Sequence, residues 1–298
     1  MTETPVAPEL LTHESTLREL TTDKGVLRYH EAGQGPPLVL LHGSGPGVSG
    51  WRNFSGSLGL FAGHFRTLIL EFPGFGISDP TDEHAMLGAP ATVLRFLDGL
   101  GLDRVDLIGN SMGGQVATKL ALTRPERVRR LVTIGGIGRN LYAPMPSEGL
   151  RLLTDFVDDP TRPNLVRWLR GMVFDQSLIT EELIEDRLST GTEAQTLATA
   201  RSMFGSEALK FLIAAAQAGG VPEWAQLGNI TAPTLLTWGR DDRVTPLDSS
   251  IIPMRAIPNG ELHVFPNSGH WVMIEAKEAW ESVVLAFLTR PDACSDAS

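Results

Sequence analysis

Short apolar runs that end at glycine-containing loops recur along the chain, and segments with helical apolar spacing separate them. Runs of this kind are typical of buried parallel strands, and apolar residues at three- and four-residue spacing are typical of covering helices. Strands are therefore expected at Val26–His30, Leu38–Leu41, Thr67–Leu70, Val105–Gly109, Arg130–Ile134, Thr234–Trp238 and Glu261–Phe265. Helices are expected at Trp51–Phe61, Ala91–Leu100, Met112–Thr123 and around Trp280–Leu288. The alternation predicts an α/β fold with a mostly parallel sheet covered on both faces.

The strand pattern stops between about residues 141 and 220, where only helical segments remain. The pattern indicates helices at Ser147–Val157, Pro163–Phe174 and Glu181–Leu188, and two weaker ones that begin near Glu193 and Ser206. Thr180 is expected to cap the third of these helices. The sequence thus predicts a helical cap of residues 143–216, inserted into a core of residues 1–142 and 217–298. Residues 1–13 are expected to form a loose arm.

The stretch Val105–Met112 runs from a buried strand into a helix through a glycine-rich turn. Gly109, Ser111 and Gly113 form the pattern Gly-x-Ser-x-Gly, which at a strand-to-helix turn indicates a nucleophilic serine in a strained, exposed position. The N–H of Met112 would then lie at a helix N-terminus, where negative charge is favoured. The alternative interpretation is an ordinary glycine-rich turn.

A serine nucleophile needs a base within hydrogen-bond reach, and in an open α/β sheet such groups gather at the carboxyl ends of the strands. Of the seven histidines, only His42 and His270 follow strand ends in glycine-containing loops. His42 heads the loop His42–Gly47, which it is expected to shape. His270 follows the last strand and is therefore the candidate base, with a structural histidine as the alternative.

The acid that orients the base should come from another strand end. The loop after Arg130–Ile134 has no acidic residue, whereas the loop after Thr234–Trp238 contains Asp241 and Asp242. Spacing alone leaves the choice between these two aspartates open, and the other one is expected to pair with a flanking arginine at the surface. The chain order of serine, aspartate and histidine is the order found in α/β-hydrolases.

Charge and composition narrow the possible partners. The net charge of −10 disfavours nucleic acid and anionic membranes, which bind basic patches. The one cysteine, Cys294, allows no intramolecular disulfide, and no signal peptide or apolar run of about 20 residues is present, so a cytoplasmic protein is expected. No His/Asp cluster has the spacing of metal ligands, and neither a metal nor another cofactor is expected.

Three motifs resemble the α/β-hydrolase superfamily, namely Gly109–Gly114, Trp238–Pro246 and Ser268–Trp271. More narrowly they resemble the meta-cleavage product hydrolases, which cut carbon–carbon bonds in ring-fission products of aromatic catabolism. The similarity covers nearly the whole chain and includes Ala143–Gly149 and Asp175–Leu183 in the cap. It implies a small-molecule substrate and a dimer or larger homo-oligomer.

The resemblance also implies roles for individual residues. Ser111 would attack the substrate, His270 would relay protons, and Asp242, rather than its neighbour, would orient His270. The backbone N–H groups of Met112 and Ser44 would form the oxyanion hole. Further positions are implied to contact the substrate, and these are Gly43, Asn110, Met172, Arg187, Val244 and Trp271. Among them, Asn110, Arg187 and Trp271 would hold the 2-oxo-dienoate end.

The sequence indicates a functional role for Arg187 independently of the resemblance. This residue falls on the apolar face of its helix, where a charge needs an anionic partner. The alternative is an arginine that extends its head to water at the cap surface. Two positions depart from the family pattern: Ser44 replaces a glycine, and Val244 stands where relatives often carry a larger aromatic residue. These changes are expected to reshape the part of the pocket that receives the acyl group.

The leading hypothesis is therefore a hydrolase that cleaves a carbon–carbon bond in a vinylogous 1,5-diketone acid. The same three residues could instead serve an ester, lactone or thioester, since a fold does not fix a substrate. A third possibility is a ligand-binding receptor without turnover. Haloalkane dehalogenases and epoxide hydrolases of this fold carry an aspartate at the position of Ser111 and are excluded.

Overall fold

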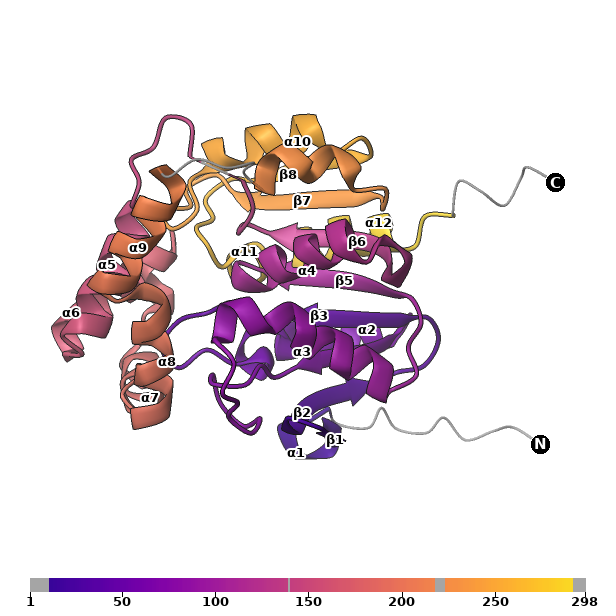
Figure 1. Cartoon of the computed structure of the whole chain (residues 1–298), viewed down its shortest axis with the longest axis horizontal. Coiled ribbons are helices and arrows are strands. Elements are labelled where there is room, and N and C mark those ends of the chain that lie inside the picture. Colours follow the sequence, from indigo (N-terminus) through magenta and orange to yellow (C-terminus); the bar gives the residue numbers. More distant parts are fainter. Residues whose placement is uncertain (1–10, 139, 218–222, 292–298) are drawn as a thin grey trace.

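The computed structural model describes residues 11–138, 140–217 and 223–291, and its described strands form one eight-stranded sheet (Figure 1). The strand order is β1-β2-β4-β3-β5-β6-β7-β8, with β3 to β8 parallel and the pairs β1·β2 and β2·β4 antiparallel. The strands are β1 (Leu17–Thr22), β2 (Gly25–Ala32), β3 (Pro37–Leu41), β4 (Arg66–Leu70), β5 (Val105–Asn110), β6 (Val128–Ile134), β7 (Thr234–Gly239) and β8 (Gly260–Phe265). All seven expected strands and the mostly parallel sheet are confirmed.

Strand β1 was not expected from the sequence. It lies at the edge of the sheet, and its residues are half-buried or exposed, so the sequence carries no continuous apolar run there. Its antiparallel pairing with β2 forms a hairpin in which Leu17 lies opposite His30. Residues 1–10 of the expected arm lie outside the described residues. Leu11 and Thr12 lead into the short helix α1 (His13–Thr16).

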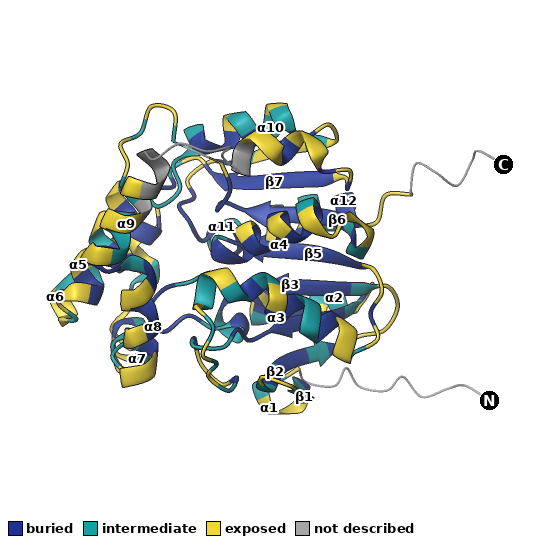
Figure 2. Cartoon of the chain, viewed as in Figure 1, coloured by how far each residue is buried: buried dark blue, intermediate teal, exposed yellow. Residues whose placement is uncertain are grey.

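Helices cover both faces of the sheet, and neighbouring strand residues alternate between two apolar clusters. Leu38 and Leu40 of β3 pack with α2 (Gly50–Ala62) and α12 (Lys277–Leu288). The intervening strand residues pack with α3 (Ala85–Gly99) and α4 (Met112–Thr123) on the other face. Figure 2 shows the central strands β3, β5 and β7 as buried. Burial on both faces is the reason these strands read as continuous apolar runs.

Two expected helix bounds were wrong. Helix α3 begins at Ala85 rather than Ala91, because the ring of His84 accepts hydrogen bonds from the first-turn N–H groups and starts the helix ahead of Pro90. The helix expected to reach Phe174 ends at Met172. Both errors fall at helix ends, where side-chain caps and neighbouring elements outweigh apolar spacing.

Between β6 and β7 the described residues form five α-helices that lie together beside the carboxyl ends of the strands (Figure 1). We refer to this group as the cap. Its helices are α5 (Glu148–Asp158), α6 (Arg162–Met172), α7 (Glu181–Gly191), α8 (Ala194–Phe204) and α9 (Ser206–Gln217). The Thr180 side chain accepts a hydrogen bond from the N–H of Leu183, which confirms its capping role. Residues 218–222, at the expected return to the core, and Cys294 lie outside the described residues.

The remaining short helices complete the core. They are α10 (Ile251–Ala256), which leads into β8, and α11 (Val272–Glu275), which follows the loop that carries His270. Within the described residues, no helix has both the length and the apolar character needed to cross a membrane.

Candidate active site

Ser111 occupies the turn between β5 and α4 with a strained backbone. Its φ is 51° and its ψ is −112°, a combination that a non-glycine residue adopts at a cost of about 1–3 kcal/mol. The N–H of Ser111 donates to the carbonyl oxygen of Ile134 on β6 at 2.9 Å, which helps to hold the turn. The strain agrees with the sequence prediction, although the residue is half-buried rather than exposed. Strain of this kind is typical of functional positions.

The flanking glycines are required by close backbone packing. A Cβ atom on Gly109 would lie 2.2 Å from the carbonyl oxygen of Gly113, and a Cβ on Gly113 would lie 2.1 Å from that of Leu41. No side chain fits at such distances, so α4 can start this close to β5 and β3 only with glycine at both positions. The Gly-x-Ser-x-Gly pattern therefore has the geometric reason that the sequence suggested.

His270 and Asp242 are hydrogen-bonded through His270 Nδ1 and Asp242 Oδ2 at 2.7 Å. The second oxygen, Asp242 Oδ1, accepts from the N–H groups of Val244 at 2.8 Å and Thr245 at 2.9 Å. The hydroxyl of Thr245 donates to Asp242 Oδ2 at 2.8 Å. Both oxygens are thus fixed, and with Nδ1 engaged the free ring nitrogen of His270 is Nε2. Thr245 was missed by the sequence analysis, because a threonine in a turn carries no signal by itself.

The two neighbouring aspartates face different partners. Asp242 and His270 are both buried, whereas Asp241 is half-buried and pairs with Arg240 at 3.1 Å. Spacing left this choice open, and the resemblance selected Asp242. The structure places Asp242, and not Asp241, on His270.

Gly135 and Gly136, at the end of β6, lie between Ser111 and His270. A Cβ on Gly136 would be 2.1 Å from the carbonyl oxygen of Ser111, and a Cβ on Gly135 would be 3.4 Å from His270 Cε1. Both glycines have positive φ values, 60° and 85°. The loop that supplies no acid therefore packs against both the serine turn and the His270 ring.

The loop after β3 packs against the serine turn. The N–H of Gly43 donates to Asn53 Oδ1 at 3.0 Å, and a Cβ on Gly43 would lie 2.8 Å from Asn110 Oδ1. Ser44, the expected oxyanion donor, is half-buried in this loop. Met112, the other expected donor, is the first residue of α4, whose first-turn N–H groups have no partner within the helix.

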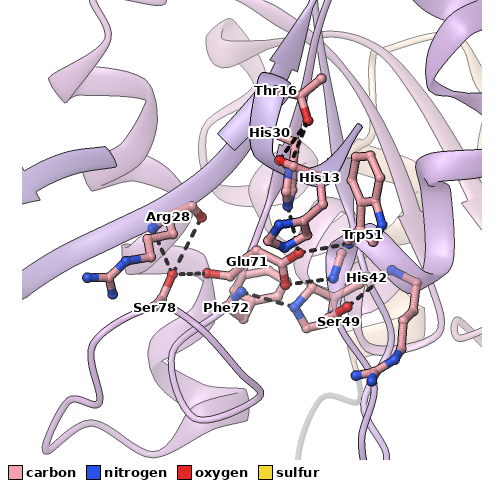
Figure 3. Close-up of polar contacts among 12 residues, drawn as sticks. His13, Thr16, Arg28, His30, His42, Ser49, Trp51, Glu71, Phe72 and Ser78 are labelled. Atoms are coloured by element: carbon pink, nitrogen blue, oxygen red, sulfur yellow. Dashed lines mark hydrogen bonds and ion pairs between the residues drawn. The ribbon is translucent and has the colours of Figure 1, made fainter. Parts of the chain in front are cut away.

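A buried glutamate that the sequence analysis missed supports this loop. Glu71, after β4, accepts hydrogen bonds at 2.7 Å from the N–H groups of Gly50 and Trp51 at the start of α2, and its Oε1 lies 3.6 Å from His30 Nε2 (Figure 3). Burial raises the pKa of Glu71, but the contacts with His30, the nearby His42 and the two N–H groups outweigh it, so the net pKa is lowered. An ionised carboxylate therefore lies under the N-terminus of α2, where the helix dipole favours it.

His42 is held as a neutral ring between two backbone groups. Its Nε2 accepts from the N–H of Phe72 at 3.0 Å, and its Nδ1 donates to the carbonyl oxygen of Gly43 at 2.6 Å (Figure 3). Complete burial lowers the pKa of His42, which keeps the ring uncharged. These contacts agree with the expected loop-shaping role.

The cap is tied directly to the loop that carries His270. The N–H of His270 donates to the carbonyl oxygen of Met172 at the end of α6, at 2.7 Å. The Glu275 carboxylate accepts from Gly269 N–H at 2.7 Å on one oxygen and from Phe174 N–H at 2.6 Å on the other. Since the last turn of α6 and the His270 loop share these contacts, a shift of either one displaces the other.

Arg187 lies inside the cap rather than at its surface. Its side chain is 4% exposed, its Nη1 donates to the carbonyl oxygen of Pro46 at 3.3 Å, and its guanidinium carbon lies 5.6 Å from the ring centre of Trp271. Burial, together with the nearby charge of Arg52, lowers the pKa of Arg187 to about 10. The surface alternative for this residue is therefore wrong. Arg187 Nε has no hydrogen-bond partner within the described part of the chain.

The other expected contact residues surround the same region. Asn110 is buried, and its Nδ2 donates to the carbonyl oxygen of Ile134 at 3.2 Å. Trp271 and Met172 are buried in one apolar cluster, against which the half-buried Val244 packs. A Cβ on Gly149 of α5 would lie 2.6 Å from Val244 Cγ2, so Val244 is in contact with the start of the cap. Within the described ranges, no group of three or more histidine, cysteine or acidic side chains could hold a metal ion.

Comparison with known proteins agrees with this fold. The model of the alpha/beta hydrolase fold family matches residues 36–277, and the chain belongs to this family. It is 38% identical over 289 residues to the 2-hydroxy-6-oxo-6-phenylhexa-2,4-dienoate hydrolase of Burkholderia cepacia, covering 92% of this chain and 97% of that protein. It is 40% identical over 269 residues to a 2-hydroxy-6-oxononadienedioate/2-hydroxy-6-oxononatrienedioate hydrolase of Pseudomonas putida, covering 88% and 91%.

Among solved structures, the chain is similar to the meta-cleavage product hydrolase CumD of Pseudomonas fluorescens IP01, in a mutant form complexed with acetates. The TM-score is 0.81 at 27% identity, and the match covers 91% of this chain and 97% of that one. The expected resemblance to the meta-cleavage product hydrolases is confirmed. The protein is an enzyme of the hydrolase class.

Proposed function

We propose that this enzyme hydrolyses a carbon–carbon bond in a 2-hydroxy-6-oxo-dienoate, a vinylogous 1,5-diketone acid, with Ser111 as nucleophile, His270 as base and Asp242 as the group that orients His270. The observation that carries the proposal is the buried cation of Arg187, held on the loop after β3 that packs against the serine turn. A buried guanidinium with an unpaired donor favours an anionic ligand, and an ester hydrolase has no general need for one.

The first proposed step is ketonisation of the bound dienol. The enol proton leaves the 2-hydroxyl, and a proton is added to the carbon next to the distal carbonyl, so that this carbon becomes saturated. Arg187 would hold the carboxylate end throughout, with Asn110 and Trp271 beside it. This step matters because the bond to be broken then lies between a saturated carbon and a carbonyl.

In the second step Ser111 Oγ attacks the distal carbonyl while His270 Nε2 takes its proton. The N–H groups of Met112 and Ser44 would stabilise the tetrahedral oxyanion. Its collapse breaks the carbon–carbon bond, and the electron pair leaves as a dienolate that recovers one proton from His270. Water, deprotonated by His270, then hydrolyses the acyl-enzyme. One water is consumed, and a carboxylic acid and a 2-hydroxydienoate are released.

A spectrophotometric screen tests the proposal. Coloured ring-fission products with aryl and alkyl tails are assayed beside p-nitrophenyl esters, with wild type, Ser111→Ala and Arg187→Ala. We expect rapid bleaching of at least one dienoate by wild type, none by Ser111→Ala, and a reduction of kcat/KM by about a hundredfold in Arg187→Ala from the loss of a charge-assisted contact.

The same screen gives a different result for each of the alternative functions. Rapid ester turnover with inert dienoates would replace the proposal with an esterase, lactonase or thioesterase function. Unchanged dienoate turnover in Arg187→Ala would remove the main support for an acid substrate. A receptor without turnover would show no labelling of Ser111 by a fluorophosphonate, whereas the proposed nucleophile is labelled in wild type and not in Ser111→Ala.

A further inference from the structure

A second buried donor lies on helix α6 of the cap. Trp168 on α6 is 2% exposed, and its indole Nε1–H has no hydrogen-bond partner within the residues that the structure describes. An unpaired N–H in an apolar interior loses its hydrogen bond to water without replacement, so tryptophans in such places normally have a partner. Trp238 and Trp280 follow this rule: their indole groups donate to Thr245 O at 2.7 Å and Thr237 Oγ1 at 3.2 Å.

The six-membered ring of the Trp168 indole lies against the loop after β3. A Cβ on Gly45 would lie 3.0 Å from both Cζ2 and Cη2 of Trp168, and Cζ2 is bonded to the ring carbon that bears Nε1. Gly45 directly follows Ser44, the proposed oxyanion donor. The part of the ring next to the unpaired donor therefore lies against this loop.

Arg187 reaches the same loop two residues further on. Its Cδ would lie 3.2 Å from a Cβ on Gly47, and its Nη1 donates to Pro46 O. Helices α6 and α7 thus each place one buried side chain with an unpaired N–H on the three consecutive residues 45–47. Two unpaired donors on one short loop favour a ligand group with several acceptor lone pairs, as a carboxylate has.

We infer that Trp168 is a specificity-determining residue whose indole N–H donates to the carboxylate end of the substrate together with Arg187. The inference rests on the proposed function and assigns a role to a residue outside the clamp of Asn110, Arg187 and Trp271. Since an indole donates and cannot accept, Trp168 favours an ionised carboxylate over an ester or an amide N–H at this position.

The test is Trp168→Phe, which keeps an aromatic ring and removes the donor. It is assayed with a dienoate acid, with the methyl ester of that acid, and with a p-nitrophenyl ester. We expect kcat/KM for the acid to fall about ten- to a hundredfold and to fall much less for the other two, because a hydrogen bond to a charged group is the stronger one. The dissociation constant of the acid in a Ser111→Ala background should rise by a similar factor.

Phe156→Leu is the matched control, because Phe156 is a fully buried cap residue of α5 without a donor. It should lower the melting temperature as Trp168→Phe does, but without discrimination between acid and ester. Equal losses on all three substrates in Trp168→Phe, or no loss, would overturn the inference and leave the proposed function intact. If wild type neither cleaves nor binds any dienoate, the proposed function fails first and this inference fails with it.

Discussion

Glu275 accepts a hydrogen bond at 2.7 Å from the N–H of Gly269, the residue immediately before His270. Its other oxygen accepts from the N–H groups of Phe174 at 2.6 Å and Asp175 at 2.9 Å, directly after the last turn of α6. One half-buried carboxylate therefore fixes the backbone of the proposed base and the backbone of the cap together. Burial raises the pKa of this carboxyl in spite of the three donors.

Glu275→Gln should loosen this connection. An amide has one accepting oxygen, so either Gly269 or the two cap N–H groups would face an NH₂ donor and lose their partner. We expect a loss of about 1–3 kcal/mol in the free energy of unfolding and a lower kcat, measured by urea unfolding and by turnover. Glu278→Gln, at an exposed position of α12, is the control and should change neither. Equal behaviour of the two variants would contradict the role assigned to Glu275.

Asp242→Asn should reduce kcat by about 10⁴-fold with little change in KM, because the amide presents an NH₂ group to His270 Nδ1 and favours the wrong tautomer. The backbone N–H groups of Val244 and Thr245 require an accepting oxygen on the opposite side, so the amide cannot simply rotate. Asp241→Asn alters the neighbouring residue, which pairs with Arg240, and should cost less than about threefold. A large effect at Asp241 and a small one at Asp242 would reverse the assignment.

Arg187→Met should raise the free energy of unfolding of the ligand-free protein and lower kcat/KM for the substrate. The guanidinium is buried and contacts one carbonyl oxygen and an aromatic face, so an apolar side chain of similar length removes a desolvation cost. We expect a gain of about 1 kcal/mol or more by urea unfolding without ligand. Arg52→Met, which breaks a half-buried ion pair with Asp186, should instead lower stability slightly. A loss of stability in Arg187→Met would indicate a structural role.

Because of the buried His42, the free energy of unfolding should be lower in mild acid than at neutral pH. Burial lowers the pKa of His42 below 6.5, so on acidification the unfolded chain takes up a proton that the folded state excludes. Its contribution to the free energy of unfolding should therefore fall as the pH drops through about 6.5. The ring signals of His42, followed by NMR from about pH 8 to 5.5, should not titrate in the folded protein. Titration of His42 over this range would contradict the prediction.

The sheet, the helical cap and the serine turn could be predicted from the sequence alone. The apolar runs of β3 to β7 reflect burial on both faces, and the glycines around Ser111 reflect close backbone packing, of Gly109 on Gly113 and of Gly113 on Leu41. Burial and close packing restrict the residue type at each position, so they leave a readable pattern. The edge strand β1 left none, because its half-exposed residues pack on one side only.

Contacts between polar residues that are distant in the chain could not be predicted without the folded structure. Asp241 and Asp242 are adjacent and chemically alike, and their spacing gives no preference, yet only one of them lies 2.7 Å from His270. The support of Glu71 for the start of α2 and of Glu275 for Gly269 depends on strands and helices that are distant in the chain. Directional contacts of this kind depend on where the folded backbone places each side chain. The pattern of hydrophobic and polar residues does not predict that placement.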